Sequence, residues 1–149
     1  MTFREFNFAM IRDGILGKLL PLEIKRSFPR LSLEDGKLCA AFIGFRVAQE
    51  NRAPIAFPPV YYLKITYPQC ALQSFERIPA GAAPAAGHPM TARSGEKVKR
   101  LMELCDAALK CFDEQSDGLE SALSAYNALL DALLEPEQLA VLNRFSNAS

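Results

Sequence analysis

The order of hydrophobic and polar positions divides this chain into two parts. Before position 79, short apolar stretches alternate in steps of two between turn-forming residues, as in β-strands. After position 92, apolar positions recur in steps of three and four, as in amphipathic helices. We therefore predict an α+β fold that forms one domain, with a β-sheet region at residues 1–78, a Pro/Ala/Gly linker at 79–92 and a helical region at 93–149.

The first region predicts an antiparallel sheet of about five strands. We expect the first strand at residues 6–10, and Asp13-Gly14 predicts a hairpin turn into a return strand at residues 15–24. Residues 27–35 are interpreted as turn-rich, and Asp35-Gly36 predicts a second tight turn. The remaining strands are expected at residues 37–47, 60–67 and 70–78.

The second region predicts a helical hairpin followed by a short third helix. The apolar stripe of the first helix is Val98, Leu101, Cys105, Ala108 and Phe112. The stripe of the second helix is Leu119, Ala122, Tyr126, Leu129 and Leu133. Pro136 suits the first turn of the third helix, at residues 137–145. We expect these helices to cover one face of the sheet.

Charge separates the two regions, although the chain carries no formal net charge. Residues 1–78 hold 11 Lys and Arg against 7 Asp and Glu, and residues 79–149 hold 6 against 10. A neutral chain argues against a dedicated nucleic-acid binder. The opposite signs of the two regions favour attraction between them, within one chain or across a dimer.

The compartment is expected to be the cytoplasm. The first residues lack a signal-peptide pattern, and no apolar run approaches the roughly 18 residues of a membrane span. The four cysteines form no Cys-x-x-Cys pair and no metal-ligand spacing with the single histidine. We therefore expect free thiols, no membrane attachment, no metal and no cofactor.

No motif in the chain assigns a catalytic residue. His88 is the only histidine and lies in the linker, where rigid positioning is least expected. Turn chemistry explains Asp13 and Asp35 without catalysis. Cys70 follows a turn and is the cysteine for which we expect most exposure. A small enzyme that uses carboxylates or Cys70 is thus one alternative.

We predict that the protein is a non-enzymatic interaction or assembly module that forms a homodimer. Binding of a different protein partner is a further possible role. The second helix is more apolar than one partner helix can cover, so the dimer is expected to join each sheet to the other chain's helices. The interaction residues are expected to be Leu123, Tyr126, Leu130 and Leu134, with the basic Lys97 and Arg100. A different alternative is a ligand-binding domain with an apolar pocket between sheet and helices, lined by Phe42, Phe45, Tyr61 and Leu63.

Overall fold

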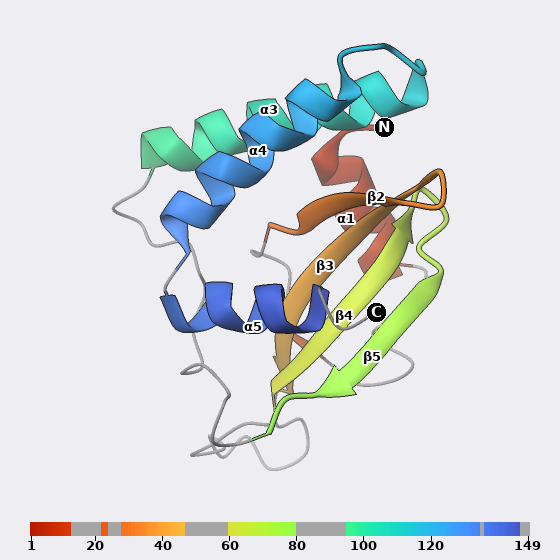
Figure 1. Cartoon of the computed structure of the whole chain (residues 1–149). Helices are drawn as coiled ribbons and strands as arrows, with labels where there is room; N and C mark the ends of the chain where they lie inside the picture. Colours follow the sequence, from red (N-terminus) through yellow and green to blue (C-terminus); the bar gives the residue numbers. More distant parts are fainter. Residues whose placement is uncertain (13–21, 24–27, 47–59, 80–94, 135, 147–149) are drawn as a thin grey trace.

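The computed structural model describes residues 1–12, 22–23, 28–46, 60–79, 95–134 and 136–146 of the chain. Their order is helix, strands, then helices, and Figure 1 shows their arrangement. The elements are α1 (Phe3–Arg12), β1 (Leu22–Glu23), β2 (Arg30–Glu34), β3 (Lys37–Arg46), β4 (Val60–Tyr67), β5 (Leu72–Arg77), α3 (Gly95–Asp113), α4 (Leu119–Leu133) and α5 (Pro136–Ser146). The α+β class is confirmed.

The sheet is antiparallel throughout. Its order is β1-β3-β4-β5, and β2 also pairs with β3. The two-residue β1 lies opposite Phe45 and Arg46, whereas β2 lies opposite residues 37–41, so both strands use the same edge of β3. Within the described residues, the sheet is therefore four strands wide, with β5 at one edge and β1 and β2 at the other.

The turn between β2 and β3 is the one that the sequence predicts. Asp35 and Gly36 both have positive φ, 53° and 77°. Glycine adopts this conformation without steric cost and aspartate tolerates it, which is why Asp-Gly favours two-residue hairpins. The turn sets the register so that Glu34 lies opposite Lys37 and Leu31 opposite Ala40.

The N-terminal segment is a helix and not the strand predicted at residues 6–10. Thr2 and Glu5 form a capping box, in which the Glu5 amide donates to Thr2 Oγ1 (3.2 Å) and the Thr2 amide donates to Glu5 Oε1 (3.0 Å). Phe3, Phe6 and Ala9 follow in steps of three and are buried. Phe8, which the strand interpretation placed beside Phe6, is 62% exposed. Two aromatic residues in alternation were too short a pattern to separate a strand from a helix.

The residues interpreted as turn-rich contain a strand, β2, at Arg30–Glu34. Leu31 points into the core and is only 2% exposed, which anchors the strand. The hairpin predicted at Asp13-Gly14 and most of its return strand lie outside the described residues, as do residues 80–94 of the predicted linker. The strands expected at 37–47, 60–67 and 70–78 correspond to β3, β4 and β5.

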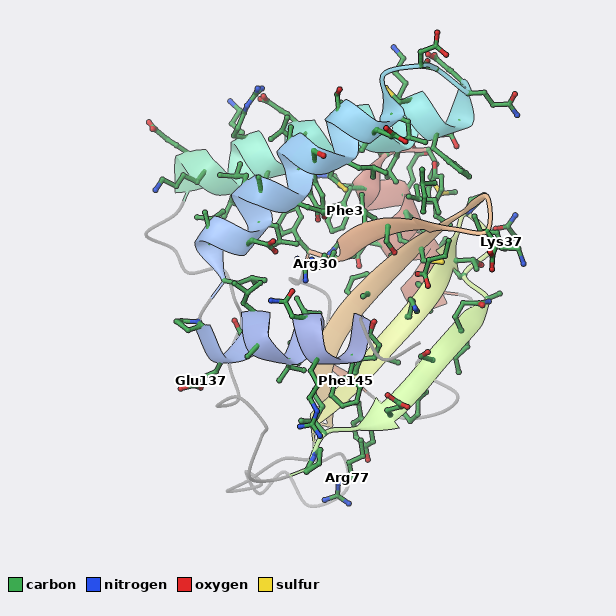
Figure 2. The ribbon with its side chains drawn as sticks, viewed as in Figure 1. Phe3, Arg30, Lys37, Arg77, Glu137 and Phe145 are labelled. Carbon is green, nitrogen blue, oxygen red and sulfur yellow. The ribbon has the colours of Figure 1, made fainter. Side chains whose placement is uncertain are left out.

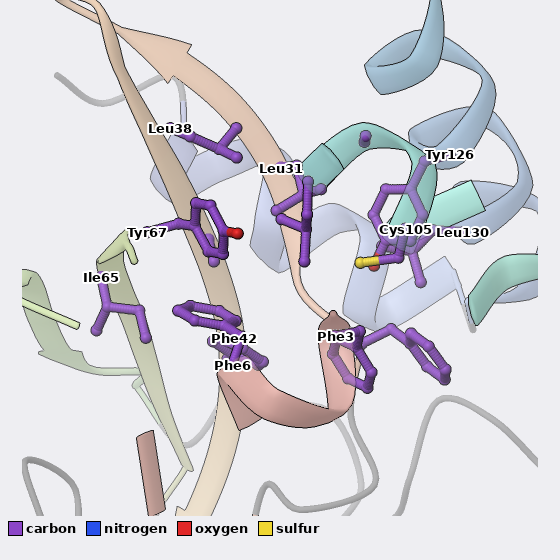
Figure 3. Close-up of a cluster of buried hydrophobic side chains, with 14 of the residues drawn as sticks. Phe3, Phe6, Leu31, Leu38, Phe42, Ile65, Tyr67, Cys105, Tyr126 and Leu130 are labelled. Atoms are coloured by element: carbon purple, nitrogen blue, oxygen red, sulfur yellow. The ribbon is translucent and has the colours of Figure 1, made fainter. Parts of the chain in front are cut away.

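Helices cover both faces of the sheet, not one. We call the face that carries Leu38, Phe42, Leu63, Ile65 and Tyr67 the core face; it packs in one cluster with α1, α3 and α4 (Figure 3). The other face, which we call the α5 face, carries Ala41 and Tyr62 and packs against Val141 and Leu142. The Tyr62 ring stacks on Phe145 with centroids 5.1 Å apart. The short third helix thus lies apart from the helical hairpin, below it in Figure 1, and packs against β3 and β4.

Candidate functional site

The residues predicted to line an apolar pocket lie in the packed core. Phe42 and Leu63 are directly opposite each other on β3 and β4 and are 1% and 0% exposed. Tyr61 is half-buried and stacks on Phe75 of β5, with ring centroids 5.0 Å apart. The side chain of Phe45 lies outside the described part of the structure. Phe42 and Leu63 therefore fill the space in which a ligand was predicted.

The helical stripe predicted to form a dimer is covered by its own chain. Leu123, Tyr126 and Leu130 belong to the core cluster together with the sheet, and Leu134 is half-buried. Figure 3 shows Tyr126 and Leu130 in this cluster. The Tyr126 hydroxyl donates to the Pro29 carbonyl over 2.5 Å, which ties α4 to the start of β2. These side chains contact their own sheet, so the excess apolar surface that suggested docking in trans is satisfied in cis.

The predicted basic residues remain on the surface. Lys97 and Arg100 lie on the exposed side of α3, and Arg100 pairs with Glu103 at 3.4 Å, one turn away. Exposed pairs of this kind contribute little free energy. These two residues and the helical stripe are not brought together on one surface.

Three of the four cysteines are buried, and Cys111 is half-buried. All four are thiols outside any disulfide, as predicted. Cys70, the cysteine expected to be most exposed, is 1% exposed and packs in the core cluster. Burial raises the pKa of the Cys39 thiol, and the Glu34 carboxylate raises it further, so the thiol stays protonated. Within the described residues, no group of His, Cys, Asp and Glu is arranged to hold a metal ion.

A polar hollow of about 190 Å³ opens on the α5 face, away from α5 itself. Residues from β2 to β5 and from the β2–β3 turn line it: Glu34, Asp35, Lys37, Cys39, Lys64, Gln73 and Ser74. Lys37 lies at the end of the sheet away from Phe145 (Figure 2). The hollow therefore occupies the part of this face that the third helix leaves uncovered.

An ion pair organises the hollow. Lys64 Nζ donates to Glu34 Oε1 over 2.9 Å, and the Ser32 hydroxyl donates to Glu34 Oε2 over 3.0 Å. The hydrogen bond from Lys64 lowers the pKa of Glu34 against the opposing effect of burial. Burial alone would lower the pKa of Lys64, but Glu34 and neighbouring groups raise it overall. Both groups are charged near neutral pH and bind each other, so this pair can bind polar partners but supplies no free base or neutral amine.

Helix α4 contacts the β2 edge of the sheet at Leu31. The Leu31 amide donates to Asn127 Oδ1 over 3.1 Å, and Asn127 Nδ2 donates to the Leu31 carbonyl over 2.7 Å. The side-chain amide thus takes the place of a neighbouring strand. Arg30 next to it donates to Asp131 of α4 over 3.0 Å and to Asn143 of α5.

The opposite edge, β5, has no such cover among the described residues. β4 is the one strand that pairs with it there, and β5 forms the outer margin of the sheet in Figure 1. Leu72 is 38% exposed, and Phe75 is half-buried beside Tyr61. A register shift between Lys64 and Ile65 leaves Gln73 as the extra residue of a bulge. An uncovered edge strand is a template for pairing with another chain.

Sequence reasoning missed Asn127 and the Lys64–Glu34 pair. Asn127 is a polar residue beside the apolar stripe of α4, and asparagine has a low propensity for helix interiors. An asparagine inside a predicted helix therefore indicates a contact with another element of the fold. The pair joins residues 30 positions apart, and no local pattern relates them.

No protein-family model, curated protein or solved structure matches this chain. No helix in the described residues is both long and apolar enough to cross a membrane.

Proposed function

We propose that this protein is a non-enzymatic assembly module of the cytoplasm that associates with itself through the open edge of β5. The observation that carries the proposal is the contrast between the two edges of one sheet. Asn127 occupies the β2 edge at Leu31 with two hydrogen bonds, whereas in the described structure β5 pairs with β4 alone and its outer side has no such contact.

The chemistry of the polar hollow supports binding over catalysis. The Cys39 thiol is protonated and largely buried, and Lys64 and Glu34 are paired with each other. Gln73 and Ser74 belong to both the hollow and β5, so a strand added to this edge would also border the hollow. The proposed interface is therefore the sheet edge. It replaces the helical stripe predicted from the sequence, which packs against the sheet of its own chain.

Sedimentation equilibrium over a concentration series tests the proposal. The natural chain should show a reversible monomer–dimer equilibrium. Ser74→Lys should remove it, because a lysine in the middle of an edge strand opposes pairing between edges. Ser124→Lys, at an exposed position of α4, adds the same charge and should leave the dimer intact.

Folding of both variants is checked by far-UV circular dichroism. A chain that stays monomeric at every concentration would reject self-association. A dimer that both lysine variants weaken equally would reject β5 as its site.

A further inference from the structure

We infer that two copies pair through antiparallel β5 strands with Phe75 on the twofold axis. The inference rests on the proposed function and specifies its register. Two identical edges become antiparallel neighbours when the axis is perpendicular to the sheet. The sheet then continues across the dimer, with the core faces of both copies on the same side.

This symmetry restricts the register to three choices. Residues opposite each other in an antiparallel pair lie on the same face, so the axis must pass beside a residue of β5 and not between two. Of the four inner residues of β5, Gln73 is the extra residue of the bulge, which leaves Ser74, Phe75 and Glu76.

Two of the three registers are unfavourable. An axis at Glu76 places two carboxylates directly opposite each other, which destabilises a strand pair. An axis at Ser74 places the bulge residue Gln73 opposite Phe75 of the partner subunit. The bulge then interrupts the hydrogen bonds between the two β5 strands directly beside the axis.

An axis at Phe75 makes both faces complementary. On the core face, the two Phe75 rings lie opposite each other and extend the existing stack of Phe75 on Tyr61. Arg77, which is exposed and lies opposite Tyr61, becomes the diagonal neighbour of Phe75 of the partner subunit. A guanidinium in that position can lie over an aromatic ring.

On the α5 face, the same register pairs Ser74 with Glu76 of the partner subunit, twice by symmetry. Ser74 lies opposite Lys64 and lines the hollow, so the partner's Glu76 brings a carboxylate to a hollow rim that carries two lysines. The serine hydroxyl can donate to that carboxylate. Each copy therefore contributes a residue to the other's hollow.

The paired stretch is short, because Gln73 forms a bulge on one side and Pro79 follows on the other. Pro79 cannot donate a ladder hydrogen bond. Interfaces of this small size are weak. The test therefore traps the pair covalently.

Engineered disulfides report the register. Opposite Cα atoms in an antiparallel pair are about 4.5–5.5 Å apart, within disulfide reach, whereas residues offset by two are about 8 Å apart, beyond it. Cys111, which is partly exposed, is changed to serine in every sample, and the other three natural cysteines are buried. Phe75→Cys should then form a covalent dimer under mild oxidation.

Matched controls use the neighbouring positions. Ser74→Cys alone and Glu76→Cys alone should not cross-link, but an equal mixture of the two should form the heterodimer. The mixture keeps Phe75 and decides the question if Phe75→Cys fails to fold. Sedimentation of the natural chain is run beside these samples.

The results separate the register from the proposed function. A chain that dimerises in solution while the mixture gives no more cross-linking than either single variant would overturn the register and leave self-association standing. Equal cross-linking in all samples would also overturn it, as random collision. A natural chain that is monomeric throughout would reject the proposed function itself.

Discussion

Asn127→Ala should destabilise the protein through the loss of one side chain's contacts with β2. The asparagine amide donates to and accepts from the backbone of Leu31, at 2.7 and 3.1 Å. A hydrogen bond of this kind contributes about 0.5–1.5 kcal/mol net, so the pair contributes about 1–3 kcal/mol. Alanine is the better helix former by about 0.5 kcal/mol, which offsets part of the loss. We expect a net loss of about 0.5–2.5 kcal/mol in the free energy of unfolding.

Urea denaturation followed by far-UV circular dichroism measures this loss. Ser124→Ala is the matched control, because Ser124 is exposed on the same helix and gains a similar helix propensity without losing a contact to β2. The difference between the two variants isolates the hydrogen bonds and should be about 1–3 kcal/mol. Equal stability of the two variants would refute the view that Asn127 closes this edge.

The same variant also tests why one edge is closed. Without Asn127, the backbone of Leu31 is open to pairing, so the chain has two edges available instead of one. Sedimentation of Asn127→Ala should show species larger than the dimer. A distribution that stops at the dimer would show that α4 shields β2 by its bulk alone.

Two further predictions concern stability. Leu130→Ala should lower the free energy of unfolding in urea by about 2–5 kcal/mol because Leu130 is fully buried. Leu129→Ala should lower it by less because Leu129 is half-buried. The reverse order would contradict the packing of α4. Burial raises the pKa of the Cys105 thiol to about 12 and also raises the pKa of the Tyr67 and Tyr126 phenols, so these groups stay protonated longer in the folded chain than in the unfolded one. Their stabilisation is complete below the unfolded pKa values of about 8.5 for Cys and 10 for Tyr, and it is lost as pH rises towards the folded values. The free energy of unfolding should fall by about 3 kcal/mol between pH 8 and pH 10, of which about 2 kcal/mol comes from Cys105, so the fall should be smaller in Cys105→Ala. A constant free energy of unfolding would contradict this.

Local patterns in the sequence were sufficient for the class of the fold and for most of its elements. The Asp35-Gly36 turn followed from the conformational freedom of its two residues. β4 alternates apolar and polar residues from Leu63 to Tyr67, and α3 repeats its stripe over several turns, so both patterns predicted the correct element. The prediction of a strand in place of α1 was wrong because Phe6 and Phe8 also alternate. Burial of Phe3 and Phe6 in the core favours the helix over the strand.

The candidate site depended on tertiary structure. The sequence shows that α4 carries more apolar surface than one helix can cover, but not that the sheet of the same chain covers it. It contains Asn127 and β5, but which sheet edge is closed depends on where α4 lies after folding. The Lys64–Glu34 pair likewise forms only when β2 and β4 lie on either side of β3. Periodicity records which side of an element is buried; the partner that buries it is decided by packing between segments far apart in the chain.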